Sequence, residues 1–221
     1  MKKKLVIFGG GQIAQLAHFY FSTDSCYDVV AFTVDPEFLT EAILFGLPVV
    51  SFDRVADLYP AGDHEMFVAL SYSKQNSNRA EKFSAAKELG YTLATYISTR
   101  ATYLSTTPPG QNCFILEDNT VQPFVSIGDN VTMWSGNHIG HHSTVANHCF
   151  IASHVVISGG VSVGEYCFIG VNATLRDHIT IGERCVLGAG TLILANAEAG
   201  GVYIGTASAR SKIPSSRLKN L

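Results

Sequence analysis

The sequence predicts an N-terminal α/β domain of the Rossmann type followed by a left-handed parallel β-helix of hexapeptide repeats. Three observations predict this fold class. Large aliphatic residues recur at every sixth position over residues 115–193. A small residue follows most of them. Near the N-terminus, a glycine-rich turn joins a short apolar run to a segment with helical apolar spacing.

The aliphatic repeat runs without a missed step. Its members are Ile115, Val121, Ile127, Met133, Ile139, Val145, Ile151, Ile157, Val163, Ile169, Leu175, Ile181, Leu187 and Ile193. Neither a helix nor a simple alternating strand produces a six-residue period. In a hexapeptide β-helix each repeat forms one short strand and three repeats form a triangular coil, so equivalent residues stack every eighteen positions. We therefore expect the aliphatic side chains to fill a continuous core inside the prism.

Charge and cysteine content narrow the class of protein. With 15 Lys and Arg against 18 Asp and Glu, and no basic stripe, nucleic-acid binding is not expected. The apolar run near the N-terminus ends at Gly9, and no later run is long enough to cross a bilayer, which predicts a cytoplasmic protein without membrane insertion. Four of the five cysteines fall on inward repeat positions without CxxC spacing, which predicts buried free thiols and no metal: Cys113, Cys149, Cys167 and Cys185.

The first hundred residues have the layout of a phosphate-binding βαβ unit. Residues 4–9 and 29–34 are predicted strands, and 12–21 a helix. Between them Gly9, Gly10, Gly11 and Gln12 begin a G-x-G-x-x-(G/A) pattern, and Asp35 ends the second strand. Glycines let the backbone approach a phosphate, the helix N-terminus attracts it, and the acid can hold a ribose hydroxyl. The domain is too short for two mononucleotide halves, which favours a mononucleotide; the alternative is a tight turn without a ligand.

The rest of this domain contains a second segment that is a candidate for ligand binding. Further strands are predicted over 47–52, 66–71 and 92–98, with helices over 54–59 and 79–89. The loop 71–79 follows the end of a strand, where α/β sheets bind ligands, and Ser71, Asn78 and Arg79 suit a phosphorylated or sugar ligand. A solvated loop with Asn78 as the helix N-cap is an equal alternative. The predicted boundaries are 1–100 for this domain, 101–111 for a linker, 112–206 for the β-helix and 207–221 for a tail.

Histidines are concentrated in the repeat. None occupies the inward aliphatic position, so all six are expected on faces or corners of the prism. His148, His154 and His178 each lie three residues past an aliphatic, which suggests a turn preference more than a site. The segment 138–143 contains His141 and His142 in the densest group of titratable side chains. An imidazole can accept a proton near neutral pH, which suits general-base catalysis.

Several motifs together resemble a known family. They are GHHSTV at 140–145, SGGVSVG at 158–164, the hexapeptide run and the N-terminal glycines. The chain resembles the bacterial sugar acyltransferases of the sialic acid O-acetyltransferase-like family, which includes nucleotide-linked amino-sugar N-acetyltransferases of the bacillosamine and perosamine type. The resemblance extends over nearly the whole chain, domain order included. It is specific for the fold and for acetyl transfer, but not for the sugar.

The resemblance implies an activity and an assembly. The expected protein is a homotrimer with acetyl-CoA in the groove between two subunits, a UDP- or TDP-linked amino sugar held by the N-terminal domain, and no metal. The resemblance implies that His141 is the general base and that the Gly159 amide faces the thioester oxygen. It implies cofactor contacts at Gly159, Gly170 and Gly188. The implied substrate contacts, together with those expected from the loop, are Gly9, Gly10, Gly11, Gln12, Asp35, Ser71, Asn78 and Arg79.

The chain departs from the family pattern at two places. The family has a carboxylate after the catalytic histidine, whereas this chain has His142. Either Glu117 or Asp118 from an adjacent coil replaces that carboxylate, or His141 and His142 exchange roles. The family's Gly-x-Pro-Ala-Lys/Arg ending is also altered, because residues 205–210 lack the proline. Contacts of CoA with this ending are therefore not predicted.

Four functions fit the sequence to different degrees. The first is N-acetylation of a nucleotide-linked amino sugar, and the second is O-acetylation of a sialic acid or another surface sugar. The third is a zinc enzyme of the γ-carbonic anhydrase kind, because His142 and His178 are two coils apart; no earlier histidine completes the usual set of three ligands. The fourth is a non-catalytic trimer that binds nucleotide sugars.

Overall fold

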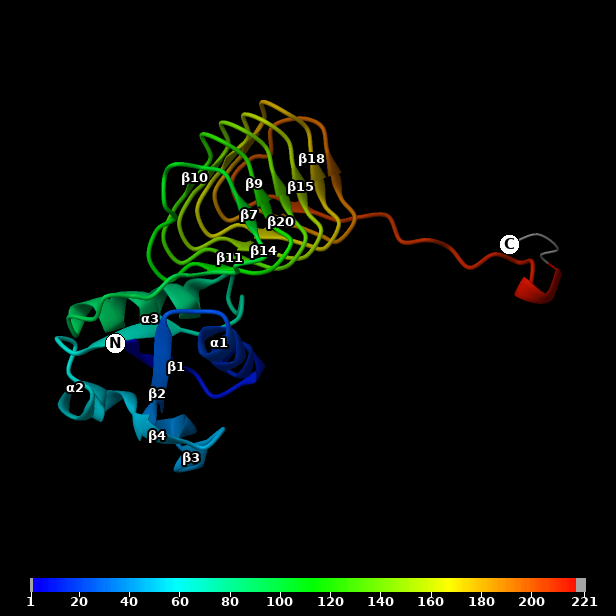
Figure 1. The fold of residues 1–221 in the computed structure, drawn as a ribbon. Coiled ribbons are helices and arrows are strands. Elements are labelled where there is room, and N and C mark those ends of the chain that lie inside the picture. Colours follow the sequence, from blue (N-terminus) through cyan, green and yellow to red (C-terminus); the bar gives the residue numbers. More distant parts are fainter. Residues whose placement is uncertain (1, 218–221) are drawn as a thin grey trace.

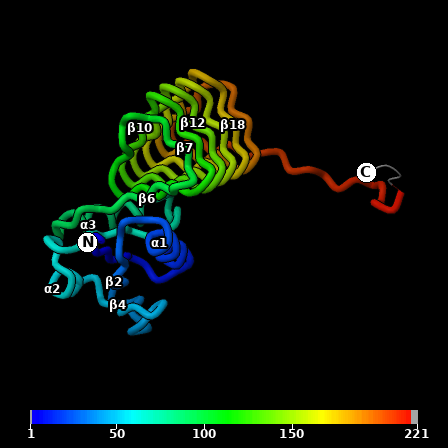
Figure 2. The backbone as a smooth tube through the Cα atoms, viewed as in Figure 1, coloured from blue at the N-terminus to red at the C-terminus, as the bar shows by residue number. Residues whose placement is uncertain are grey.

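The computed structural model describes residues 2–217 and confirms the predicted fold class. An α/β domain packs against one side of a stack of triangular coils, a left-handed parallel β-helix (Figure 1). After the last coil the chain runs outward, away from both domains (Figure 2). Within the described residues, no helix combines the length and the apolar character needed to cross a membrane.

The N-terminal domain is a five-stranded sheet in the order β3-β4-β2-β1-β5. It is parallel except for the pairing of β3 with β4. Its strands are β1 (Lys3–Phe8), β2 (Tyr27–Val34), β3 (Ile43–Leu44), β4 (Leu47–Ser51) and β5 (His64–Val68). The helices are α1 (Gln12–Thr23), α2 (Val55–Leu58) and α3 (Ser77–Glu88), with 3₁₀ turns η1 (Pro36–Phe38) and η2 (Phe52–Arg54) here and η3 (Ser215–Arg217) in the tail.

Two apolar clusters cover the two faces of this sheet. Leu5 and Ile7 of β1 pack with Phe21 of α1. Val6, the residue between them, packs with Phe83 of α3 in the second cluster. Alternate side chains of a strand point to opposite faces, so an unbroken apolar run can serve both helices. This explains why β1 shows no polar alternation in the sequence.

The β-helix consists of three parallel sheets of two-residue strands. Sheet I contains β6 (Tyr96–Ile97), β8 (Phe114–Ile115), β11 (Thr132–Met133), β14 (Phe150–Ile151), β17 (Phe168–Ile169), β20 (Val186–Leu187) and β22 (Val202–Tyr203). Sheet II contains β7 (Thr102–Tyr103), β9 (Thr120–Val121), β12 (His138–Ile139), β15 (Val156–Ile157), β18 (Thr174–Leu175) and β21 (Leu192–Ile193). Sheet III contains β10 (Ser126–Ile127), β13 (Thr144–Val145), β16 (Ser162–Val163) and β19 (Thr180–Ile181).

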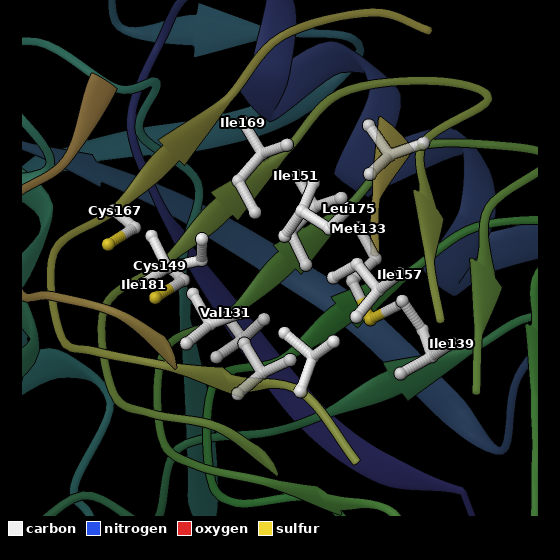
Figure 3. Close-up of a cluster of buried hydrophobic side chains, with 14 of the residues drawn as sticks. Val131, Met133, Ile139, Cys149, Ile151, Ile157, Cys167, Ile169, Leu175 and Ile181 are labelled. Carbon is white, nitrogen blue, oxygen red and sulfur yellow. The ribbon is translucent and has the colours of Figure 1, made fainter. Parts of the chain in front are cut away.

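The coils stack with the predicted eighteen-residue register, as in the pairing of Ile151 with Ile169. The aliphatic repeat positions and the four repeat cysteines form one buried cluster, and all five cysteines are free thiols. Figure 3 shows labelled members of this cluster converging on the interior from the surrounding strands. Buried Cys113 illustrates the environment, because burial raises the pKa of its thiol to about 12. The prediction of buried, unpaired cysteines is confirmed.

The β-helix begins earlier than predicted. The predicted strand over 92–98 is split, because Leu93 bridges to β5 whereas β6 pairs with β8 of the coil. Strand β7, inside the predicted linker 101–111, pairs with β9. Ile97 and Tyr103 are in phase with the aliphatic repeat, but Pro109 occupies the next position. Proline stands where the repeat requires an aliphatic residue, and it cannot donate a ladder hydrogen bond. The six-residue repeat therefore could not be followed in the sequence from Ile115 back to Tyr103 and Ile97.

The three corners of the prism use a left-handed backbone conformation. We name each corner by the two sheets it joins: I/II, II/III and III/I. The third residue past the aliphatic has positive φ at Asn130, His142, His148, His154 and His178, among others. Asparagine, histidine and glycine tolerate this region better than most residues. The interpretation of His148, His154 and His178 as turn residues is therefore supported.

The two domains meet on sheet I, with Arg79 at the centre of the contact. Its side chain is 1% exposed. Its guanidinium donates to Asn130 Oδ1 and to the carbonyl of Cys149, both at 3.1 Å. Asn76, not Asn78, is the N-cap position of α3, and its Nδ2 donates to the Cys167 carbonyl. Arg79 therefore joins the domains, which corrects its predicted role as a substrate contact.

Candidate functional site

The N-terminal domain contains a cavity of about 740 Å³ at the ends of β1 and β2. Both apolar and charged side chains line it. The lining residues are Phe8, Gly9, Gly10, Gly11, Val34, Asp35, Phe38, Thr40, Glu41, Leu44, Val49, Leu70, Lys74, Asn78, Glu81 and Lys82. Ligands of open α/β sheets bind at this edge, outside the carboxyl ends of the strands.

The glycine turn forms the part of the cavity wall that adjoins the start of α1. Gly9 has φ +124°, and a Cβ at this position would lie 2.8 Å from the Ala69 carbonyl oxygen, so a larger residue does not fit. Gly11 is the N-cap of α1, and no side chain caps the helix there. The first N–H groups of a helix lack intrahelical acceptors and carry the positive end of its dipole. The turn therefore presents an anion-binding end of a helix to the cavity.

An ion pair lies in the cavity wall. Lys82 Nζ is 2.6 Å from Asp35 Oδ1, and both side chains are less than one-third exposed. The same ammonium lies over the rings of Phe8 and Phe52 at 5.5 and 5.4 Å. Sequence reasoning missed Lys82, although Asn78 and Lys82 are four residues apart and share one face of α3. Asp35, the predicted ribose ligand, thus has a cation beside it.

The cavity brings together five of the eight predicted substrate residues: Gly9, Gly10, Gly11, Asp35 and Asn78. Gln12, Ser71 and Arg79 do not line it. Gln12 is exposed on the first turn of α1. The Ser71 carbonyl accepts a hydrogen bond from Arg79, whose guanidinium points into the domain interface. Of the predicted loop 71–79, Lys74 and Asn78 line the cavity, whereas Ser71 and Arg79 do not.

The second candidate region is corner II/III, where His141 and His142 follow β12. The His141 imidazole lies directly against Gly159 of the next coil, because a Cβ there would be 2.8 Å from Nε2 and 2.6 Å from Cε1. The His141 backbone N–H donates to Gln122 Oε1 at 2.8 Å. The Nδ1 atoms of His141 and His142 are 3.1 Å apart. Only glycine at position 159 leaves room for the His141 ring.

The backbone around Gly159 leaves one donor available. The Gly159 carbonyl accepts from the His178 N–H at 3.0 Å, and the Gly160 N–H donates to the His141 carbonyl at 2.8 Å. Within residues 2–217 the Gly159 N–H has no hydrogen-bond acceptor. A base and an unused amide donor therefore lie side by side on an exposed corner. This pairing suits attack on a carbonyl that develops negative charge on oxygen.

Neither proposed acid contacts the histidine pair within this chain. Glu117 and Asp118 lie on corner I/II, one face of the prism away. Glu117 accepts hydrogen bonds from Tyr20 at 2.8 Å and from Ser135 at 2.9 Å. Burial alone would raise the pKa of Glu117, but these hydrogen bonds and that of the backbone outweigh it and hold the pKa below its ordinary value. Glu117 therefore takes part in the contact between α1 and the coil.

The three predicted cofactor glycines do not share one corner. Gly159 lies on corner II/III, whereas Gly170 and Gly188 lie on corner I/II. A Cβ at Gly170 would meet the backbone nitrogen of Ala189 at 2.7 Å, so the close stacking of coils explains this glycine. The three predicted contacts therefore lie on two edges of the prism that are separated by the face of sheet II.

The cavity and the histidine corner lie on opposite sides of one chain. The N-terminal domain packs on sheet I, and Tyr72 contacts Phe150 and Phe168 of that sheet. Corner II/III is the edge of the triangular prism that faces away from sheet I. In Figure 1 the domain lies below β11 and β14, whereas β9 and β10 lie on the far side of the coil. A single chain therefore keeps its two candidate regions apart.

The residues between positions 2 and 217 show no cluster of three or more His, Cys, Asp or Glu that could hold a metal ion. His142 and His178, considered as zinc ligands, lie on the same corner with Gly160 between them. A Cβ at Gly160 would clash with His178 Nδ1, so the His178 ring covers this glycine. The corner geometry thus gives His178 a packing role.

Comparison with known proteins agrees with this fold. Residues 160–195 match the family model described as bacterial transferase hexapeptide (six repeats). No curated protein sequence gives a significant match. Similar solved structures include the acetyltransferase domain of PglB from Neisseria gonorrhoeae, with 21% identity, a TM-score of 0.78 and coverage of 92% of this chain and 97% of that domain. The same domain is also known in complex with acetyl coenzyme A.

Two further structures share the arrangement of both domains. PerB from Caulobacter crescentus, in complex with CoA and GDP-perosamine, is 23% identical, with a TM-score of 0.65 and coverage of 91% of this chain and 94% of PerB. WeeI from Acinetobacter baumannii is 18% identical, with a TM-score of 0.77 and coverage of 92% and 97%. The resemblance drawn from the motifs is confirmed at the level of the fold, across nearly the whole chain.

Proposed function

We propose that this chain is an acetyl-CoA-dependent acetyltransferase that acetylates the amine of a nucleotide-linked amino sugar. The observation that carries the proposal is the His141 ring against Gly159, which places a base beside an unused amide N–H. Two supporting facts come from proteins of the same fold, since the PglB domain binds acetyl coenzyme A and PerB binds CoA and GDP-perosamine. The N-terminal cavity supplies an anion-binding helix end for the nucleotide.

The residues suggest a direct transfer. The amine nitrogen attacks the thioester carbonyl carbon while His141 Nε2 accepts a proton from that nitrogen. The Gly159 N–H stabilises the negative charge that develops on the carbonyl oxygen. When the carbon–sulfur bond breaks, the CoA thiolate leaves and takes up the proton held by His141. No covalent acyl-enzyme forms, and every atom of the acetyl group passes from sulfur to nitrogen.

We place this reaction between copies of the chain, in a homotrimer. One chain holds the cavity and corner II/III on opposite sides, so its own nucleotide sugar does not reach its own His141. In a trimer, the corner of one copy faces the N-terminal domain of its neighbour. The expected mass in solution is three times the 23.8 kDa of the chain.

The activity is tested by thiol release from acetyl-CoA with a panel of UDP-, TDP- and GDP-linked sugars, each carrying either an amine or only hydroxyls. Release with the amino sugars alone supports the proposal. Release with the hydroxyl sugars alone supports O-acetylation instead, and no release with either class contradicts an acetyltransferase. The Gly159→Ala variant should lose activity because its Cβ displaces His141, whereas Gly62→Ala, in open space with ordinary φ, is the matched control.

The shared site is tested by complementation. A copy lacking the base, His141→Asn, is co-expressed with a copy altered in the cavity, Lys82→Met. If the site lies between copies, mixed trimers regain activity because some clefts combine an intact corner with an intact cavity. Mixed assemblies no more active than either variant alone would contradict the shared site, provided that mass measurement shows that mixed trimers form.

A further inference from the structure

We propose that His142 is a positioning residue, whose neutral imidazole accepts a hydrogen bond from His141 Nδ1–H and thereby leaves His141 Nε2 as the basic atom. This inference rests on the proposed function, because it assigns a role within the same corner. It also replaces the two earlier alternatives, in which a distant acid assists His141 or the two histidines exchange roles.

The geometry of the pair sets the position of one proton. The two Nδ1 atoms are 3.1 Å apart, and a hydrogen bond between two ring nitrogens needs a proton on one of them and a lone pair on the other. A Cβ at Gly159 would lie 2.6 Å from Cε1, 2.8 Å from Nε2 and 3.1 Å from Nδ1 of His141, and Nδ1 also contacts His142. Because the contact with His142 occupies Nδ1, Nε2 is the ring nitrogen left to act as a base, and this requires the proton on Nδ1. His142 Nδ1 is then the acceptor, and its own proton lies on Nε2.

His142 is itself held in place from the preceding coil. The Phe124 ring lies on the His142 ring with centroids 4.7 Å apart and an angle of 37° between the planes. Both residues have positive φ, of +66° and +59°. This is the regular left-handed corner position of the coil, although phenylalanine is uncommon in that backbone region. Phe124 is also 65% exposed, so its position is not explained by burial in the core.

Few other charges face the pair. The strands flanking this corner are β9, β12 and β15 on one side and β10, β13 and β16 on the other; among their residues only His138 is titratable. Along the corner, the coil before the pair contributes Pro123 and Phe124, and Arg176, Asp177 and His178 follow two coils later. Gln122, which accepts from the His141 N–H, is neutral. The imidazolium that forms on His141 therefore has an orienting partner without negative charge.

Three variants separate orientation from charge at this position. All keep the left-handed backbone, because glycine, asparagine and aspartate tolerate it. His142→Gly removes the acceptor, and kcat should fall about 10- to 100-fold, as for other partners that orient a ligand or base, with both KM values within about twofold. His142→Asn restores an acceptor oxygen and should recover most of kcat. His142→Asp adds a negative charge and should move the acid limb of the kcat–pH profile upward by about one pH unit or more.

A second readout does not depend on turnover. Long-range ¹H–¹⁵N spectra of the ¹⁵N-histidine-labelled chain report which nitrogen of His141 carries the proton. The expected result is Nδ1–H in the unaltered protein and a shift toward Nε2–H in His142→Gly. An unchanged His141 tautomer together with unchanged kcat in His142→Gly would overturn the inference. If His141→Asn remains fully active, the proposed base is wrong, but the spectra still decide whether His142 fixes the tautomer.

Discussion

The cavity of the N-terminal domain and corner II/III of the β-helix differ in how completely one chain builds them. The cavity is walled by residues of four strands (β1 to β4), of helix α3, of the 3₁₀ turn η1 and of the connecting loops, and its Asp35–Lys82 pair is partly buried. The corner carries His141 and His142 as exposed side chains on one edge of a prism. A binding site needs an enclosing surface, and only the cavity has one within a single chain. The corner has exposed histidines without such an enclosure, and in the proposed trimer a second copy would enclose them.

The variant with the largest expected effect, His141→Asn, should lose catalysis without losing affinity for the nucleotide sugar. In His141→Asn, kcat should fall about 10²- to 10⁴-fold, because the general base is lost. Nucleotide-sugar affinity, measured by calorimetry, should stay the same because the cavity is untouched. His154→Asn is the matched control, since His154 is an exposed corner residue on corner I/II. A kcat for His141→Asn within about threefold of the control value would remove His141 from the mechanism.

The next largest expected effect is a loss of stability at the contact that holds the N-terminal domain on the β-helix. Burial lowers the pKa of Arg79 to about 10, so the guanidinium stays charged at neutral pH. Arg79→Ala leaves several buried acceptors without a donor, and the free energy of unfolding should fall by about 3 kcal/mol or more. Denaturant unfolding measures this. Arg54→Ala, which breaks the exposed pair with Asp57, should change stability by less than about 1 kcal/mol. Equal effects of the two variants would mean that Arg79 does not hold the domains together.

A smaller effect tests the cavity alone. In Lys82→Met the cavity loses a cation and Asp35 loses its partner, so affinity for a nucleoside diphosphate should fall about tenfold, or about 1.4 kcal/mol. Affinity for CoA should not change. Lys87→Met, at the last turn of the same helix and outside the cavity, is the control. Titration calorimetry with each ligand gives the comparison, and a loss of CoA affinity would show that the two regions are not separate.

The smallest expected effect is a pH dependence of stability at the domain contact. Burial lowers the pKa of His148, with a further contribution from the nearby Arg79 charge. The unfolded chain then binds a proton at His148 more readily than the folded chain does. Stability should therefore be fully present above the ordinary histidine value of about 6.5 and decline as pH falls below it.

The His148→Asn variant tests this assignment. Asparagine suits the left-handed corner, as at Asn130 of the preceding coil. The decline in unfolding free energy from pH 7 to pH 5 should be shallower in the variant, as measured by denaturant unfolding at each pH. An equally steep decline would assign the pH dependence to other groups.

Sequence periodicity located the coil, and interruptions in that periodicity hid its beginning. The repeat over 115–193 required no long-range information, because each hexapeptide has the same inward position. Pro109 broke the phase before Tyr103 and Ile97, so β7 was missed and β6 was assigned to the α/β domain as part of the strand predicted over 92–98. In the cavity, the glycine turn was recognisable from local spacing. Lys82 was not, because its role depends on how α3 packs on the sheet, which places its ammonium beside Asp35.

The sequence by itself determined the coil, its corners, the phosphate-binding layout of β1 and α1, and the adjacent histidines, because each is encoded by local spacing. Only the tertiary structure decided that Arg79 enters the domain contact and that Glu117 is bonded to Tyr20. These facts depend on which side of the prism carries the N-terminal domain. Local periodicity repeats equally on all three sides, so it cannot make that choice; the packing of apolar side chains such as Phe150 against Tyr72 makes it.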